Sequence, residues 1–135
     1  MPNFETFRRA LLPLKSEPFV TIQKRGTMSL NLSAFVALDS PVSVELLYDR
    51  GKEIVGIRVA DPRADNAYHV RTTSPSGPFV VSAMAFTKFY DLDIAVTRRW
   101  PAYLDNGVLC VDLTKDGLPV TSNRARRRRD DEDAS

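Results

Sequence analysis

The chain has 135 residues, of which 43% are hydrophobic and 27% charged, with a formal net charge of +2. This length and composition are sufficient for one compact domain with a hydrophobic core. No apolar run approaches the ~20 residues of a membrane-spanning helix, and the N-terminus lacks the basic and apolar regions of a signal peptide. We therefore expect a cytoplasmic protein without membrane contact. The single cysteine, Cys110, excludes an internal disulfide and a cysteine-rich zinc site.

The spacing of apolar residues predicts short strands with a few short helices. An amphipathic helix is expected at residues 3–14, where Phe4, Phe7, Leu11 and Leu14 recur at helical spacing. Strands are expected at residues 19–24, 27–30, 42–48, 54–59, 67–73, 79–81, 102–104 and 108–113, and an extended segment at 94–98. Two further short helices are expected at residues 32–38 and 83–90, capped by Asn31 and Ser82. Apolar content collapses from Thr114 onward, which predicts a disordered charged tail.

Part of this order occurs twice, because residues 20–38 and 70–90 both read strand, glycine turn, strand, cap and helix at a shift of 51. The matched pairs are Thr21 and Thr72, Gly26 and Gly77, Asn31 and Ser82, Ala34 and Ala85, and Phe35 and Phe86. Duplication and chance similarity both explain this match. The corresponding fold is mainly β with short helices (α+β), a small antiparallel β-barrel built from two ββαββ-like half-units. The expected segments are an N-terminal helix at 1–18, half-units at 19–61 and 62–117, and a tail at 118–135.

The sequence offers little for catalysis. His69 is the only histidine, no His/Cys cluster or spaced carboxylate motif is present, and no glycine-rich phosphate loop links a strand to a helix. We therefore expect no enzyme activity, no catalytic residue, no metal and no cofactor.

Basic residues in turns and strands favour nucleic-acid binding instead. The net charge is small, so this prediction depends on where the charges lie. The candidate nucleic-acid-binding residues are Lys24, Arg25, Arg50, Lys52, Arg58, Arg71, Arg98 and Arg99. Trp100 and Tyr103, which follow two of these arginines, are candidates for stacking on unpaired bases. The alternatives are solvated turn charges and, for Trp100, a place in the core or at a sheet edge.

The stretches Phe19-Val20-Thr21-Ile22-Gln23-Lys24-Arg25-Gly26-Thr27-Met28-Ser29-Leu30-Asn31, Val44-Glu45-Leu46-Leu47-Tyr48-Asp49 and Ile54-Val55-Gly56-Ile57-Arg58-Val59 resemble a known pattern. It is the swapped-hairpin DNA-binding domain of AbrB-type regulators, and a tandem copy is similar to MraZ-type regulators. The resemblance implies an interleaved dimer or pseudo-dimer that binds DNA through Lys24 and Arg25. Asn31 stands where that family usually has proline.

The sequence is compatible with three functions. The first is a DNA-binding protein, a transcriptional regulator or nucleoid-type factor, with double-stranded DNA as its partner and a homodimer as a further expectation. The second is a β-rich interaction module that binds a protein partner and no nucleic acid. The third is single-stranded nucleic-acid binding through Trp100 and Tyr103.

Overall fold

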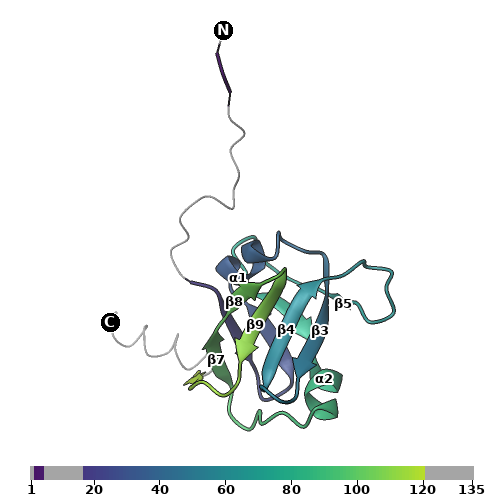
Figure 1. Cartoon of the computed structure of the whole chain (residues 1–135), viewed down its shortest axis with the longest axis vertical. Coiled ribbons are helices and arrows are strands. Elements are labelled where there is room, and N and C mark those ends of the chain that lie inside the picture. The colour runs from purple at the N-terminus through teal and green to yellow at the C-terminus, as the bar shows by residue number, and fades with distance from the viewer. Residues whose placement is uncertain (1, 5–16, 121–135) are drawn as a thin grey trace.

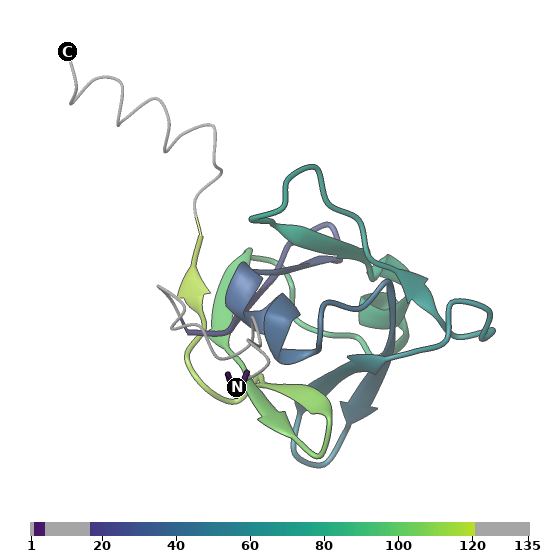
Figure 2. The ribbon, with the colours of Figure 1, turned by 90° about the horizontal axis from the view of Figure 1, so that it is seen from above.

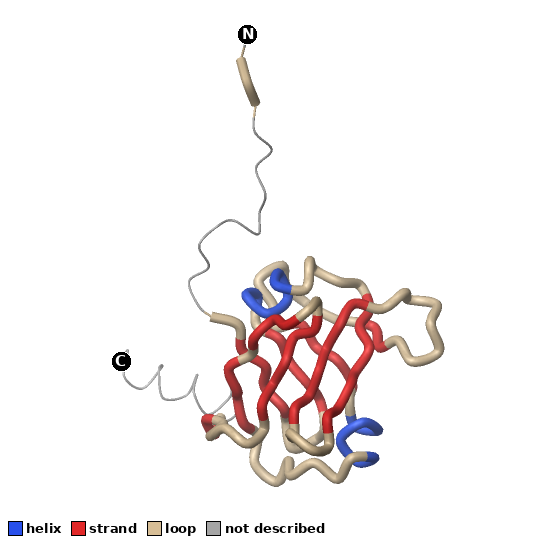
Figure 3. Tube along the Cα trace, in the orientation of Figure 1, coloured by secondary structure: helices blue, strands red, loops and turns tan. Residues whose placement is uncertain are grey.

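The computed structural model describes residues 2–4 and 17–120, which form two five-stranded antiparallel sheets packed face to face (Figures 1 and 3). The first sheet has the order β10-β7-β1-β2-β6. Its strands are β1 (Phe19–Ile22), β2 (Thr27–Leu30), β6 (Phe79–Ser82), β7 (Arg98–Pro101) and β10 (Leu118–Pro119). The second sheet has the order β5-β3-β4-β9-β8. Its strands are β3 (Ser43–Asp49), β4 (Ile54–Val59), β5 (Tyr68–His69), β8 (Tyr103–Asp105) and β9 (Val108–Asp112).

The core lies between the two sheets because each strand turns alternate side chains inward. The first sheet contributes Val20, Ile22, Met28, Leu30, Phe79, Val81 and Trp100, all of them buried. The second sheet contributes Val44, Val55, Ile57, Leu109 and Val111. These side chains form one contiguous cluster, so the chain has a single hydrophobic core.

Two six-residue helices lie at opposite ends of the space between the sheets (Figures 1 and 2). Helix α1 (Leu32–Ala37) begins at Asn31, whose side chain accepts a hydrogen bond from the Ala34 N–H at 3.0 Å. Helix α2 (Met84–Phe89) begins at Ala83, which makes no side-chain cap. The predicted cap at Ser82 is therefore wrong, because Ser82 still belongs to β6 and pairs with Thr27.

The mainly β architecture with short helices is confirmed, as are the hairpins β3–β4 and β8–β9. A single closed barrel is not confirmed, because the strands pair as two sheets. The predicted strand at 67–73 is shorter than expected: Tyr68–His69 joins the second sheet, and Arg71 forms an isolated bridge to Val80 of the first.

The predictions for the two ends of the chain have different outcomes. Residues 118–120 are not a disordered tail, because Leu118 and Pro119 pair with β7 and the Val120 N–H donates to the Thr97 carbonyl. Of the expected helix at 3–14, residues 3 and 4 are described and are not helical, whereas residues 5–14 and the rest of the tail lie outside the described residues. Within the described part of the chain, no helix is long and apolar enough to cross a bilayer.

The central strand pairings relate residues that also match in sequence. Between β2 and β6, Ser29 pairs with Val80, 51 positions further on, so this antiparallel pairing contains one residue opposite its own counterpart in the repeat. Between β4 and β9, Val55 pairs with Val111, 56 positions further on, which is also the separation of Gly51 and Gly107 in the two hairpin turns. Gly26 and Gly77, also 51 apart, both have positive φ values, of +88° and +91°. The helices are offset by 52 rather than 51, since the cap positions are Asn31 and Ala83.

Candidate nucleic-acid interface

The outer face of the first sheet carries rows of aligned side chains, with polar residues on its three central strands. The middle row crosses all five strands, since the backbone registers place its members directly opposite one another. From β10 to β6 this row is Leu118, Arg99, Thr21, Ser29 and Val80. The next row on the same face lies two residues along each strand. There the Gln23 N–H donates to the Thr27 carbonyl at 2.8 Å, and Thr27 pairs with Ser82. The face therefore presents hydroxyl and amide groups around one arginine.

This face has no carboxylate among the strand residues described in its sheet. The strands of the second sheet, in contrast, carry Glu45, Asp49, Asp105 and Asp112. The near-neutral net charge of the chain thus hides an uneven distribution, with the acidic strand residues gathered on one sheet. A surface with cations and hydroxyl groups but no anions suits a negatively charged ligand.

Two adjoining hollows shape this face. The larger, of about 660 Å³, is lined by Thr21, Gln23, Lys24, Arg25, Ser29, Pro78, Ala95, Val96, Thr97 and Val120. The smaller, of about 200 Å³, shares Thr21, Ser29, Pro78 and Val120 and adds Phe19, Leu30, Asn31 and Arg99. We call the two together the sheet groove. The Lys24 N–H donates to the Thr97 hydroxyl at 3.1 Å, which holds the basic β1–β2 turn against the segment before β7.

Arg99 lines the smaller hollow, and its guanidinium is partly buried without a hydrogen-bond acceptor for its Nε in the described part of the chain. Its guanidinium lies 4.7 Å from the centre of the Phe19 ring, a cation–π contact. Its Nε is buried, and no hydrogen-bond acceptor for it exists among the described residues. A buried donor without an acceptor costs about 1–3 kcal/mol, and more when it is charged. Arg99 is therefore the residue of the sheet groove with most to gain from an anion.

Of the predicted basic residues, Lys24, Arg25 and Arg99 line the sheet groove, whereas Arg71 is bridged to Val80 of β6 and is not among the lining residues. Arg71 donates from Nη2 to the Ser82 hydroxyl at 2.7 Å. Arg98 does not line the sheet groove either. It pairs with Ile22 at the end of β7, and strand alternation places its side chain on the opposite face of the sheet from Arg99.

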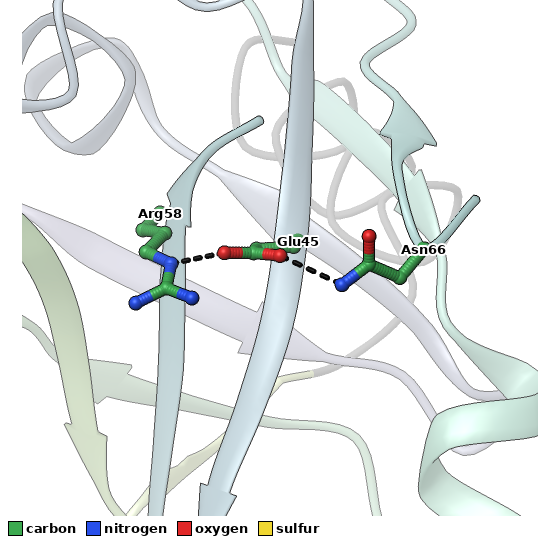
Figure 4. A network of polar contacts seen from close by, with 3 residues as sticks. All are labelled: Glu45, Arg58 and Asn66. Carbon is green, nitrogen blue, oxygen red and sulfur yellow. Dashed lines mark hydrogen bonds and ion pairs between the residues drawn. The ribbon is translucent and has the colours of Figure 1, made fainter. Parts of the chain in front are cut away.

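The remaining basic candidates lie elsewhere. Arg58 is on the outer face of the second sheet, where it forms an ion pair with Glu45 (Figure 4). The other oxygen of that carboxylate accepts from Asn66 at 2.7 Å, so Arg58 belongs to a local network. In the β3–β4 turn, Arg50 stacks 4.8 Å from the ring centre of Tyr90, and the Lys52 backbone N–H donates to Asp49 at 3.0 Å. The structure thus separates these three residues from the sheet groove.

The predicted stacking pair is contradicted for Trp100. Its side chain is only 5% exposed, and its indole N–H donates to the Lys115 carbonyl at 3.2 Å. The alternative of a core position is correct. Tyr103 is 47% exposed but lies opposite Cys110 in the second sheet. The two rings therefore do not form one stacking surface.

Sequence reasoning missed the uncharged part of the interface. Thr21, Ser29 and Thr27 carry hydroxyl groups on the same face as Arg99, but from the sequence they were expected only to be strand residues. The signal was available in the alternation of Thr21 and Gln23 with the apolar Val20 and Ile22. What the sequence did not show was which strands lie side by side. Among the described residues, no group of three or more His, Cys, Asp or Glu side chains is placed to hold a metal ion.

Comparisons of this chain with protein-family models, with curated proteins and with solved structures found no match.

Proposed function

We propose that the protein is a cytoplasmic DNA-binding protein, a transcriptional regulator or nucleoid-type factor, that holds duplex DNA against the sheet groove. The observation that carries this proposal is the composition of the groove: Lys24, Arg25 and Arg99 with neighbouring hydroxyl and amide groups, and no strand carboxylate. Arg, Lys, Ser, Thr, Asn and Gln are the side chains that contact DNA phosphates. The groove residues therefore match the sequence-independent part of a DNA interface.

The strand pairing supports a related proposal, that the chain is a tandem pseudo-dimer of two half-units in the swapped-hairpin manner. Ser29 and Val80 are counterparts in the repeat and also face each other across β2 and β6; Val55 and Val111, which are 56 apart like Gly51 and Gly107 of the two hairpin turns, face each other across β4 and β9. In a two-fold dimer, the residue on the axis meets its own copy. Such pairing agrees with the AbrB-like pattern at Phe19–Asn31 and with the DNA role that it implies.

The test is a salt titration of binding to a labelled duplex. The double variant Lys24→Ala/Arg25→Ala removes two groove cations, so its affinity is expected to fall for all sequences. The slope of log K against log salt should decrease by about 1 for each lost phosphate contact, or about 2 for the pair.

The matched control is Lys52→Ala/Arg63→Ala, which removes the same charge from two exposed residues away from the sheet groove. It should leave the slope unchanged. A second variant, ending at Val120, keeps β10 but removes the arginines at 124–129. Equal losses in the two charge variants, or binding that disappears with the tail alone, would refute the assignment of the groove.

The two alternatives predict other results. Single-stranded binding through Trp100 has lost its support because that ring is buried. An absence of salt-sensitive duplex binding would favour the protein-interaction module. The side chains best placed for that role are Met84 and Phe89 of α2, which are 52% and 71% exposed. Light scattering on the free and DNA-bound protein measures the expected homodimer.

A further inference from the structure

Three polar side chains stand in line on three adjacent strands of the sheet groove. Thr21 of β1 is paired with Arg99 of β7 on one side and with Ser29 of β2 on the other. All three line the smaller hollow, of about 200 Å³. Because Arg99 and Ser29 are both directly opposite Thr21, the guanidinium and the two hydroxyl groups border the same small hollow.

Nothing among the described residues satisfies this group of donors. The Nε of Arg99 is buried without an acceptor, and no ion pair of the described residues includes its guanidinium. The hydroxyl groups of Thr21 and Ser29 take part in none of the hydrogen bonds found there. No residue lining the smaller hollow carries a carboxylate. A positive group that is half buried and unpaired marks a site for an anion from outside the chain.

The shape of the site favours a phosphate group. The guanidinium lies over the Phe19 ring, 4.7 Å from its centre, and its fork of N–H donors matches two phosphate oxygens. The Thr21 and Ser29 hydroxyls approach from the neighbouring strands and serve the remaining oxygens. The two oxygens of a carboxylate lie in one plane, whereas a tetrahedral phosphate directs its oxygens out of any single plane toward donors on different strands.

We infer that Arg99, Thr21 and Ser29 form a discrete phosphate-binding site within the sheet groove. The site stands on its own geometry, whereas its natural occupant, a backbone phosphate of DNA, rests on the proposed function. A free phosphate compound has the same chemistry, so the experiment must separate the two sources.

The probe is inorganic phosphate, titrated into isotope-labelled full-length protein and followed by NMR, with acetate as the comparison anion. Saturable shifts are expected at the Arg99 Nε–H and at the Thr21 and Ser29 amides. Arg99→Gln should weaken binding about tenfold or more, the factor expected for one lost charge-assisted hydrogen bond. Arg99→Lys should also weaken it, because a point charge does not replace the fork.

Two further variants guard against a folding defect and a general charge effect. Thr21→Val/Ser29→Ala removes the hydroxyls, keeps the guanidinium and should weaken phosphate binding without changing the pattern of core resonances. Lys52→Ala/Arg63→Ala should leave phosphate binding unchanged. Shifts that do not saturate, that spread over all surface basic residues or that acetate reproduces equally would overturn the site.

Competition with duplex DNA then distinguishes the two proposals. Displacement of phosphate by DNA, with weaker DNA binding in Arg99→Gln, supports the site and its natural occupant. Phosphate binding that DNA does not displace keeps the site but refutes the DNA function of this face. DNA binding that depends on Lys24 and Arg25, with no phosphate binding at Arg99, refutes the site and leaves the DNA function standing.

Discussion

Gly26, in the turn that carries Lys24 and Arg25, has a backbone conformation and a contact that together require glycine. Its φ is +88°, and a Cβ there would lie 2.6 Å from the Met84 Cα and 2.9 Å from the Thr87 Oγ1. Its carbonyl also accepts the Ala83 N–H at 3.1 Å. Gly26→Ala is therefore expected to force the basic turn away from the start of α2.

The loss in unfolding free energy has two parts. The left-handed conformation costs an alanine about 1–2 kcal/mol. Overpacking against the α2 backbone adds about 1–3 kcal/mol. Gly107 separates these parts, because its φ is +79° but a Cβ there would meet nothing within 4 Å. Gly107→Ala should thus lose about 1–2 kcal/mol, and Gly26→Ala about 2–5 kcal/mol.

Urea denaturation followed by circular dichroism measures both losses, provided that the slope of unfolding free energy against urea is the same in all three proteins. If the two variants lose equal stability, the contact between the turn and α2 contributes nothing, and only the backbone argument survives. If Gly26→Ala keeps full stability, the reasoning on both parts is wrong.

Gly117→Ala would place a Cβ 2.5 Å from the Trp100 Cε2, so it should displace the indole and shift the fluorescence of this single tryptophan to longer wavelength; an unchanged emission maximum would contradict this. Burial raises the pKa of the Cys110 thiol, which should react with an aromatic disulfide far more slowly in native protein than in urea at pH 8. As the pH rises, the thiol of the unfolded chain loses its proton at a lower pH than the thiol of the folded protein. The free energy of unfolding therefore keeps the full contribution of Cys110 below about pH 8.5 and loses it progressively at higher pH. A Cys110→Ala variant with the same alkaline loss would assign that loss to other groups.

Local patterns in the sequence predicted most of the elements. Alternation located the β3–β4 hairpin, and Asn31 located the start of α1. The start of α2 was misplaced by one residue because Ser82, a good capping residue by type, is used as the last residue of β6. Residue type cannot distinguish these two uses, since the difference comes from the pairing of Ser82 with Thr27.

The candidate site was predicted only in part for the same reason. Lys24 and Arg25 stand out in sequence, but the grouping of Arg99 with Thr21 and Ser29 depends on β1 lying between β7 and β2. Arg58 shows the converse, since nothing local reveals that Glu45, on the partner strand of its hairpin, neutralises it. The burial of Trp100 likewise depends on packing contributed by residues 115–117.

The strand order also determines when the chain can fold during synthesis. Both sheets combine strands from before residue 60 with strands from after residue 67, and Val20 pairs with Trp100, eighty positions away. A nascent chain that has emerged only as far as β4 can close the β1–β2 and β3–β4 hairpins, but it lacks the neighbours that complete either sheet. Contacts between residues so distant in sequence form slowly. The apolar faces of β1 and β4 thus stay incompletely covered until β7 and β9 have left the exit tunnel, and exposed apolar surface of this kind makes an unfinished chain prone to aggregate.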